Sequence, residues 1–169
     1  AQAFSGWGIP TALSIQFEAI QRLHRAFKFN RKLAAGRLLS ELLCDAIEAS
    51  NLPRPDLLIP VPLHPSRIRQ RGFNQAMELA RVVSGRLDIP VDQFCIRRRK
   101  VTAPQSELTK RERAGNIRGA FAMQKQLRAE HVTIIDDVMT TGLTIEEIAM
   151  LLRRHGARHI DAWVVARRP

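Results

Sequence analysis

Apolar residues near the start of the chain recur at the spacing of one face of an α-helix. From Thr11 to about Phe29 they occupy positions 15, 17, 20, 23 and 27, with charged residues between them. The stretch from Lys32 to Ser50 repeats this spacing, and the segment 51–55, which holds two prolines, ends it. A period near 3.6 residues predicts amphipathic helices. We therefore expect an N-terminal helical segment over residues 1–52.

Short apolar runs later in the chain predict strands. Residues 57–61 read LLIPV, and residues 132–135 read VTII and run straight into two aspartates. Weaker candidates lie at 94–96 and 159–166. β-branched and aliphatic runs of this length, bounded by turn residues, are typical of buried strands.

Between these runs the apolar spacing predicts two further helices, over 72–87 and 144–155. Thr144 and Glu147 have the pattern of a capping box, and Gly156 is placed to end the second helix. Strands alternating with helices predict one α/β domain over residues 1–169, with a mostly parallel, twisted sheet flanked by helices. Ligands of such sheets bind beyond the carboxyl ends of the strands.

The composition is that of a folded globular chain, with 45% hydrophobic and 25% charged residues among 169. No apolar run approaches the roughly 18 residues that span a bilayer, and Arg22 is the first basic residue, so a secretory signal has no basic start. We expect a cytoplasmic location and no membrane insertion. Cys44 and Cys95 lie far apart without CxxC spacing, which supports neither a disulfide framework nor a zinc site.

The formal charge of +11 is concentrated in the middle of the chain, where residues 58–131 hold 15 Lys and Arg against 6 Asp and Glu. Such clustering suits a polyanion, either nucleic acid or a phosphate-rich small molecule, although a solvated face is the alternative interpretation. Aromatic residues are only 5% of the chain, which gives weak support to a platform for stacking bases. Residues 97–119 are basic and lack an apolar period, so we expect a functional loop there.

The residues 132–144, VTIIDDVMTTGLT, combine two kinds of chemistry. Gly142 lets the backbone approach an anion, the amides at the start of the next helix point at that anion, and three threonines add hydroxyl donors. Asp136 and Asp137 repel phosphate and suit the vicinal hydroxyls of a sugar, or a divalent cation held through water. Two structural alternatives remain: Thr144 as a helix cap only, and the acidic pair as a turn after the strand.

This stretch resembles the phosphoribosyl pyrophosphate (PRPP) binding signature of the type I phosphoribosyltransferases. The resemblance implies a fold of that type. It also implies that Asp136 and Asp137 are the catalytic pair that holds the ribose hydroxyls, with Mg²⁺ carried by PRPP beside them rather than by a protein cage. The 5′-phosphate is expected on the turn and helix start, at Thr140, Thr141, Gly142, Leu143 and Thr144.

Segments outside this stretch resemble the ComF/GntX family, whose best-known members are competence proteins of natural transformation. The matching runs are PVPLHPSR from Pro60, RGFNQ from Arg71 and GAF from Gly119. The resemblance implies a pyrophosphate-binding loop with Leu63, His64, Arg67 and Arg71. It also implies a mobile basic loop over 97–119 with Arg99, Lys100, Gln105, Arg111 and Arg113. Family members commonly carry an N-terminal four-cysteine zinc ribbon, which the two cysteines of this sequence do not supply. Two alternatives remain: the ribbon was removed from the N-terminus, or this member lacks it.

Three functions follow from the resemblance. The first is phosphoribosyl transfer, in a protein of DNA uptake, to an acceptor that the sequence does not identify. The second is binding without turnover, in which the pocket holds PRPP or a nucleic-acid 5′-phosphate and the basic face holds single-stranded DNA. The third is a scaffold for a helicase-like uptake protein, contacted through the N-terminal helices at Leu23 or Phe27. His64 is the nearest candidate for a general acid or base, or it only shapes its turn; His24, His131, His155 and His159 are interpreted as structural or surface residues.

Overall fold

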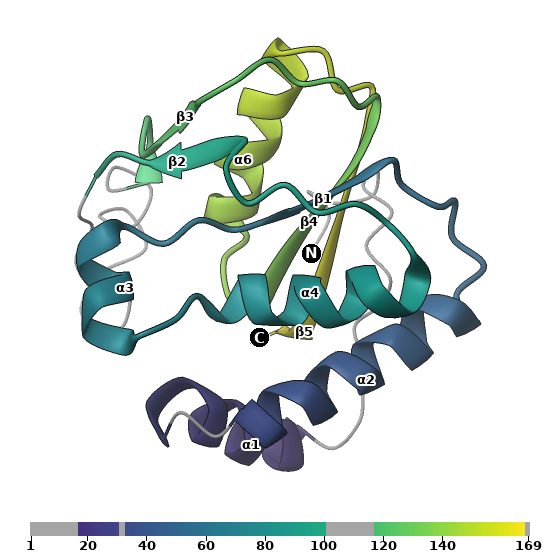
Figure 1. Cartoon of the computed structure of the whole chain (residues 1–169), viewed down its shortest axis with the longest axis vertical. Coiled ribbons are helices and arrows are strands. Elements are labelled where there is room, and N and C mark those ends of the chain that lie inside the picture. Colours follow the sequence, from purple (N-terminus) through teal and green to yellow (C-terminus); the bar gives the residue numbers. More distant parts are fainter. Residues whose placement is uncertain (1–16, 31–32, 101–116, 168–169) are drawn as a thin grey trace.

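The computed structural model describes residues 17–30, 33–100 and 117–167, and its elements alternate much as the hydrophobic pattern predicts (Figure 1). The expected N-terminal helices, the helix after the first strand and the last helix are all present. The helices are α1 (Phe17–Asn30), α2 (Leu33–Ala49), α3 (Pro65–Arg71), α4 (Gln75–Leu87) and α6 (Leu143–Arg154). The strands are β1 (Leu57–Pro60), β2 (Ile96–Arg98), β3 (Phe121–Met123), β4 (His131–Met139) and β5 (His159–Arg167).

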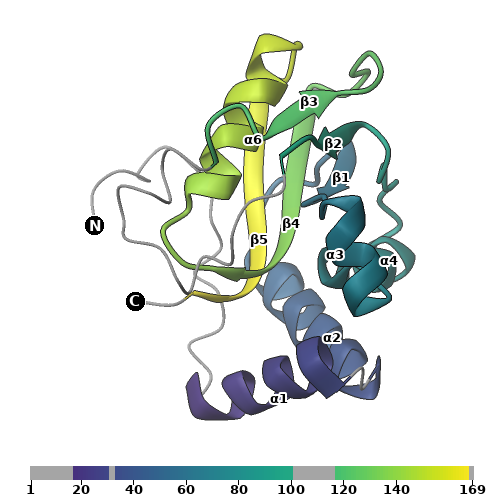
Figure 2. The ribbon, with the colours of Figure 1, turned by 90° about the vertical axis from the view of Figure 1, so that its left-hand side faces the viewer.

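The main sheet is parallel, in the order β1-β4-β5. Leu57 of β1 lies opposite Val132 of β4, and His131 lies opposite His159 of β5. Val91 extends the sheet beyond β1 by one parallel bridge to Leu58. Helices cover both faces of this sheet, which confirms the predicted α/β class (Figure 2).

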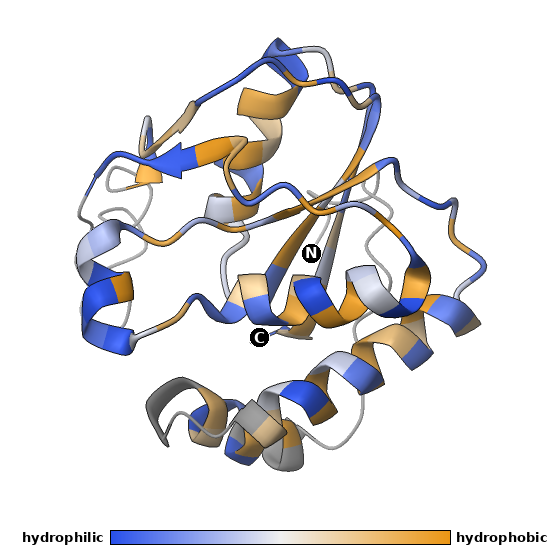
Figure 3. Cartoon of the chain, viewed as in Figure 1, coloured by the Kyte–Doolittle hydropathy of each residue, from blue (hydrophilic) through white to orange (hydrophobic). Residues whose placement is uncertain are grey.

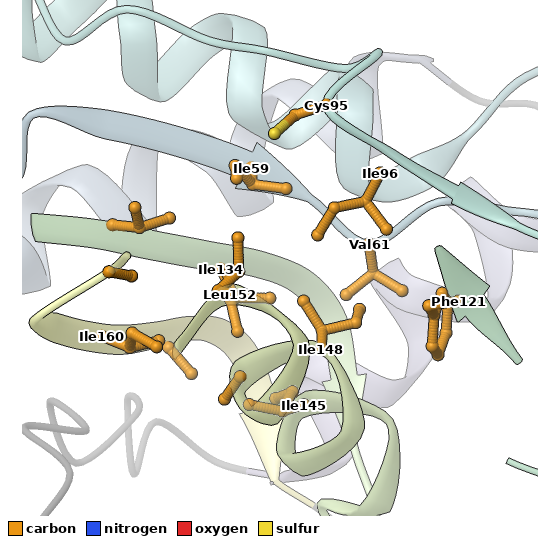
Figure 4. Close-up of a cluster of buried hydrophobic side chains, with 14 of the residues drawn as sticks. Ile59, Val61, Cys95, Ile96, Phe121, Ile134, Ile145, Ile148, Leu152 and Ile160 are labelled. Carbon is orange, nitrogen blue, oxygen red and sulfur yellow. The ribbon is translucent and has the colours of Figure 1, made fainter. Parts of the chain in front are cut away.

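Two hydrophobic clusters, one on each face of the sheet, form the core. One joins α6 and the β2-β3 hairpin to residues such as Ile59 and Ile134 (Figure 4). The other joins α1, α2 and α4 to residues such as Ile135 and Trp163. Adjacent residues of β4 thus enter opposite clusters, as the two-residue period of a strand requires. In Figure 3 the strands of the main sheet are mostly orange, whereas α3 is mostly blue.

Three local expectations were wrong. The loop expected after β1 contains the short helix α3, which ends at Gly72 with a φ of 87°, so the next helix begins at Gln75 rather than at residue 72. The strand expected at 94–96 is β2, shifted to 96–98, and it pairs antiparallel with β3 in a separate two-stranded sheet. Ile96 is the one fully buried residue of β2, and its other two residues are arginines. A strand with so few apolar residues is hard to recognise from the sequence.

The N-terminal helices are fixed to the domain by Phe27, whose side chain is only 1% exposed. Its ring lies 5.3 Å from that of Phe73, centroid to centroid, at the start of α4. On its other side the ring lies so close to Gly36 of α2 that a Cβ there would stand 2.4 Å from a ring carbon. Phe27 is therefore a core residue and is not available as the partner-binding contact expected for the scaffold function.

Arg86 of α4 holds α2 by charge. Its guanidinium makes ion pairs with Glu41, Asp45 and Glu48, at nitrogen–oxygen distances of 2.9, 2.7 and 2.6 Å. These three carboxylates share one face of α2 because they are spaced by three or four residues. Among the described residues, no helix is long and apolar enough to cross a membrane.

The packing around Gly36 predicts opposite effects for two Gly→Ala substitutions. An added Cβ at Gly36 collides with the buried Phe27 ring, whereas one at Gly85 of α4 meets nothing within 4 Å. We expect Gly85→Ala to raise the free energy of unfolding by about 0.5–1 kcal/mol through helix propensity. Gly36→Ala should lower it by up to about 2 kcal/mol, because overpacking outweighs the same gain. Urea unfolding of both variants measures these changes. A Gly36→Ala protein more stable than the wild type would contradict the close packing of the Phe27 ring against Gly36.

Candidate functional site

Asp136 and Asp137 lie near the carboxyl end of β4, the central strand of the main sheet. Both are partly exposed, whereas the preceding residues 132–135 are buried. The strand is locally irregular here: the amide of Asp137 donates to the Asp136 carboxylate and the amide of Val138 to the Asp137 carboxylate, both at 2.9 Å. The pair thus continues the strand instead of forming the turn considered as an alternative.

Asp137 faces the helices of the N-terminal half. The Nε2 atom of His24 in α1 lies 2.8 Å from its Oδ2 atom. Because an ionised carboxylate only accepts, this nitrogen carries the hydrogen. Burial lowers the pKa of the Arg71 guanidinium, and the nearby Asp137 carboxylate opposes that shift. Asp137 therefore lies between a donor from α1 and a positive charge from the end of α3.

Asp136 faces the other side of the sheet. Burial lowers the pKa of the Arg98 guanidinium on β2, nearby Arg67 lowers it further, and the Asp136 carboxylate opposes both. The Arg98 guanidinium carbon lies 5.5 Å from the centre of the ring of Phe121, its cross-strand partner on β3, which is a cation–π contact within the hairpin. The two carboxylates and the arginines Arg67, Arg71 and Arg98 therefore form one charged group, termed here the edge cluster.

The turn after β4 leads directly into α6, and its cap differs from the prediction. Gly142 is the N-cap of α6, with a φ of 78°, and it is buried. The capping box is wrong: the N-cap makes no side-chain hydrogen bond, and the Glu147 carboxylate instead accepts from the Gly119 amide at 2.7 Å. Thr140, Thr141, Leu143 and Thr144 are all partly exposed around this turn, where the first amides of α6 are directed out of the helix.

The segment after β1 is organised by His64 and Asn74. His64 is the N-cap of α3, and its Nδ1 atom lies 2.8 Å from the Ser66 hydroxyl and 3.2 Å from the Ser66 amide. Since Nδ1 accepts, neutral His64 carries its hydrogen on Nε2. Asn74 caps α4 and donates to the Val61 carbonyl at 3.1 Å, which ties the RGFNQ run to the end of β1. Leu63 is partly exposed in the same connection.

The expected basic loop is described only at its two ends. Arg97, Arg99 and Lys100 are exposed, and the Lys100 ammonium donates to the Arg118 carbonyl at 2.7 Å. Gln105, Arg111 and Arg113 lie outside the described residues. A cavity of about 250 Å³ lies near this end, between residues 117–118 and the first two turns of α6.

A divalent cation would fit the edge cluster only if phosphate oxygens of a substrate supplied part of its coordination. Within the described ranges no group of three or more His, Cys, Asp and Glu side chains is placed to hold a metal ion. Mg²⁺ is usually held by one or two carboxylates together with phosphate oxygens of a substrate. Asp136 and Asp137 match that donor set.

Sequence reasoning missed three residues of this region. The sequence pattern assigns His24 a structural or surface role, places Arg98 within the basic segment 97–119 without a role of its own, and assigns nothing to Gln75. Gln75 is 2% exposed and its side-chain oxygen lies 3.4 Å from an Arg71 nitrogen. One signal was present for His24: it shares the helical stripe of Ile20 and Phe27, which the N-terminal pattern marks as the buried face.

The comparison with protein families identifies the family to which this chain belongs. A family model described as a phosphoribosyl transferase domain matches residues 68–169, from α3 to the end of the chain. The chain belongs to the phosphoribosyl transferase domain family. The helices α1 and α2 and the strand β1 lie outside the matched part of this phosphoribosyl transferase domain.

Curated relatives extend the similarity of the phosphoribosyl transferase domain to its N-terminal helices. Competence protein F of Haemophilus influenzae is 34% identical over 168 residues, which cover 95% of this chain and 73% of that protein. DNA utilization protein YhgH of Salmonella typhi is 34% identical over 165 residues, with the same two coverages. These relatives confirm the resemblance to the competence protein family.

A solved structure supports the fold independently. The glutamine phosphoribosylpyrophosphate (PRPP) amidotransferase of B. subtilis, complexed with ADP and GMP, superimposes with a TM-score of 0.52 at 15% identity. The match covers 79% of this chain and 26% of that one. The phosphoribosyl transferase domain thus has the type I fold that its sequence predicts.

The left-handed backbone of Gly142 predicts a measurable cost for a side chain there. Gly156, at the end of α6, also has a positive φ, of 106°, but is exposed and has open space around its Cβ position. Strain alone should lower the free energy of unfolding of Gly156→Ala and Gly142→Ala by about 1–2 kcal/mol each, and Gly142→Asn should lose less than Gly142→Ala. Thermal unfolding of the three variants checks this. A Gly142→Ala protein as stable as the wild type would mean that the turn does not need its positive φ.

Proposed function

We propose that this phosphoribosyl transferase domain binds PRPP together with Mg²⁺ at the carboxyl edge of its sheet. The observation that carries the proposal is the edge cluster: two carboxylates at the end of β4, with arginines from α3 and β2 on either side and the Gly142 turn directly after them. PRPP carries a phosphate at one end and a pyrophosphate at the other end of a sugar with two free hydroxyls. Cations, hydroxyl acceptors and a backbone anion site are therefore all needed within one site.

Each part of the ligand has a chemical counterpart. Asp136 and Asp137 accept hydrogen bonds from the ribose hydroxyls, because a carboxylate has acceptor capacity and no donor. The 5′-phosphate binds the amides and hydroxyls of residues 140–144, where the positive end of α6 lies. The pyrophosphate lies toward Arg67 and Arg71, with the Leu63–His64 connection beside it and the Nε2 hydrogen of His64 as a further donor.

Phosphoribosyl transfer is the reaction that this binding would serve. The bond between ribose C1 and the pyrophosphate oxygen breaks, pyrophosphate leaves with both bonding electrons, and a nucleophilic atom of the acceptor forms the new bond to C1. Arg67 and Arg71 stabilise the negative charge that develops on the leaving group. Mg²⁺, held by the phosphates and the acidic pair, would supply further positive charge there. The acceptor is the part of the reaction for which the described residues offer no candidate.

The cellular role that we propose is in the handling of DNA taken up by the cell, in the cytoplasm. It rests on the names of the relatives, a competence protein and a DNA utilization protein, each similar to this chain over 95% of its length. A helicase-like partner remains an expectation from the family resemblance.

Calorimetric titration with PRPP and Mg²⁺ tests the proposed binding. We expect the wild type to bind and the Asp136→Asn/Asp137→Asn variant to bind at least about 10-fold more weakly, because hydrogen bonds to a charged partner contribute roughly 1.5–3 kcal/mol. Asp88→Asn is the matched control: Asp88 is exposed and has a φ of 52°, which asparagine tolerates. Absence of heat with the folded wild type would contradict PRPP binding, and release of pyrophosphate on adding acceptors would extend it to turnover.

A second candidate function is binding of single-stranded DNA. It is favoured because the arginines near the site fall into a partly buried set and an exposed set. Arg67, Arg71 and Arg98 are partly buried in the edge cluster, whereas Arg69, Arg97 and Arg99 are exposed. Within the described part of the chain no ion pair joins the exposed set to a carboxylate, and this set suits phosphates of a polyanion outside the pocket.

The two sets of arginines predict separable losses. Arg69→Gln/Arg97→Gln/Arg99→Gln should weaken binding of an oligothymidylate and reduce the slope of log affinity against log salt by roughly 2, since about 0.7 is lost for each phosphate contact. PRPP binding should stay within about 3-fold of the wild type. The Asp136→Asn/Asp137→Asn variant should show the reverse pattern in fluorescence anisotropy and calorimetry. If both ligands are lost in both variants, DNA and PRPP share one site and the separate surface is wrong.

A further inference from the structure

His24 belongs to the buried side of α1, although it is a polar residue. Ile20, His24 and Phe27 are spaced by four and three residues and so lie on one face of the helix. Ile20 is 3% and Phe27 is 1% exposed, and the His24 side chain between them is 14% exposed. In Figure 2, α1 lies beneath the end of the sheet where β4 stops. The packing of its two apolar neighbours therefore brings the imidazole to Asp137.

The Asp137 carboxylate is held at both of its oxygens. Oδ1 accepts from the Val138 amide at 2.9 Å, and Oδ2 accepts from His24 Nε2 at 2.8 Å. A carboxylate has about four acceptor positions, two on each oxygen, so these two bonds do not by themselves occupy all of them. They also fix the plane of the carboxylate, and with it the directions in which the remaining lone pairs point.

We propose that His24 is a positioning residue of the PRPP site, which orients Asp137 for the ribose hydroxyls and thereby makes the N-terminal helix α1 part of the site. The inference rests on the proposed PRPP binding. A carboxylate already fixed by its own protein loses little freedom when the ligand binds, which raises affinity without a direct contact between His24 and the ligand.

The anchoring of α1 allows a single imidazole to have this effect. Phe27, one turn beyond His24, is wedged between Gly36 and Phe73, so the helix has little freedom to move relative to β4. Phe73 belongs to the same RGFNQ run as Arg71, the cation beside Asp137. The contact between Phe27 and Phe73 thus fixes both the helix that carries His24 and the segment that carries Arg71. The part of the chain matched by the family model starts at residue 68, so His24 comes from outside it.

Three variants separate positioning from helix packing. His24→Leu keeps the approximate volume and removes the donor. His24→Gln keeps a side-chain N–H donor of similar reach. Ile20→Ala loosens the same face of α1 without removing the donor. Calorimetric titration with PRPP and Mg²⁺, with thermal unfolding measured for each protein, compares them at a temperature where all are folded.

We expect His24→Leu to bind PRPP up to roughly 10-fold more weakly than the wild type, because an Asp137 carboxylate without this donor has to be ordered when the ligand binds, and ordering one side chain costs an affinity loss of that order. His24→Gln should stay within about 3-fold, and so should Ile20→Ala even though its melting temperature falls. Equal affinity of His24→Leu and wild type would overturn the inference while leaving PRPP binding intact. A loss in Ile20→Ala as large as in His24→Leu, or no rescue by His24→Gln, would also overturn it. A folded wild type that does not bind PRPP would instead remove the proposed function itself.

Discussion

The rest of this molecule depends on one constraint. Two negative charges, Asp136 and Asp137, stand on consecutive residues at the end of a buried strand. A strand directs neighbouring side chains to opposite faces, so each carboxylate of β4 needs its own partners on its own side of the sheet. Asp137 has His24 and Arg71 on the face of α1, α2 and α4, and Asp136 has Arg98 on the face of α6 and the hairpin. The short helix and the hairpin bring cations to this edge, where unpaired charge would be costly.

The fold could be predicted from the sequence because its elements follow from local patterns. The run at 132–135 is too β-branched and apolar for anything but a buried strand, and the helical stripes around residues 20–27 and 38–47 are regular. Strand and helix alternation then limits the topology to a parallel sheet. The hairpin was beyond this reasoning, because β2 and β3 are three residues each and one of them consists mostly of arginine.

The candidate site was predictable in part. The acidic pair and the Thr-Thr-Gly turn are contiguous, so their chemistry can be interpreted from spacing alone. The contact between His24 and Asp137 joins positions 113 residues apart, and only the packing of α1 brings them together. The capping box failed because α6 begins earlier than the spacing indicates: Gly142 is the N-cap, so Thr144 lies inside the first turn, and the Glu147 carboxylate accepts from the Gly119 amide, 28 positions earlier. Local spacing does not fix the first residue of a helix to better than one or two positions.

The position of β4 in the sheet has a consequence for how the molecule opens. This strand is hydrogen-bonded on both sides, to β1 and to β5, whereas α3 has no buried residue. In native-state hydrogen exchange, the amides of β4 should therefore exchange only through global unfolding, and those of α3 through smaller openings. The two carboxylates thus lie on the most persistent strand, whereas Arg67 and Arg71 lie on the helix that opens most easily. The electrostatic environment of the edge is thus able to change while the sheet that carries it stays folded.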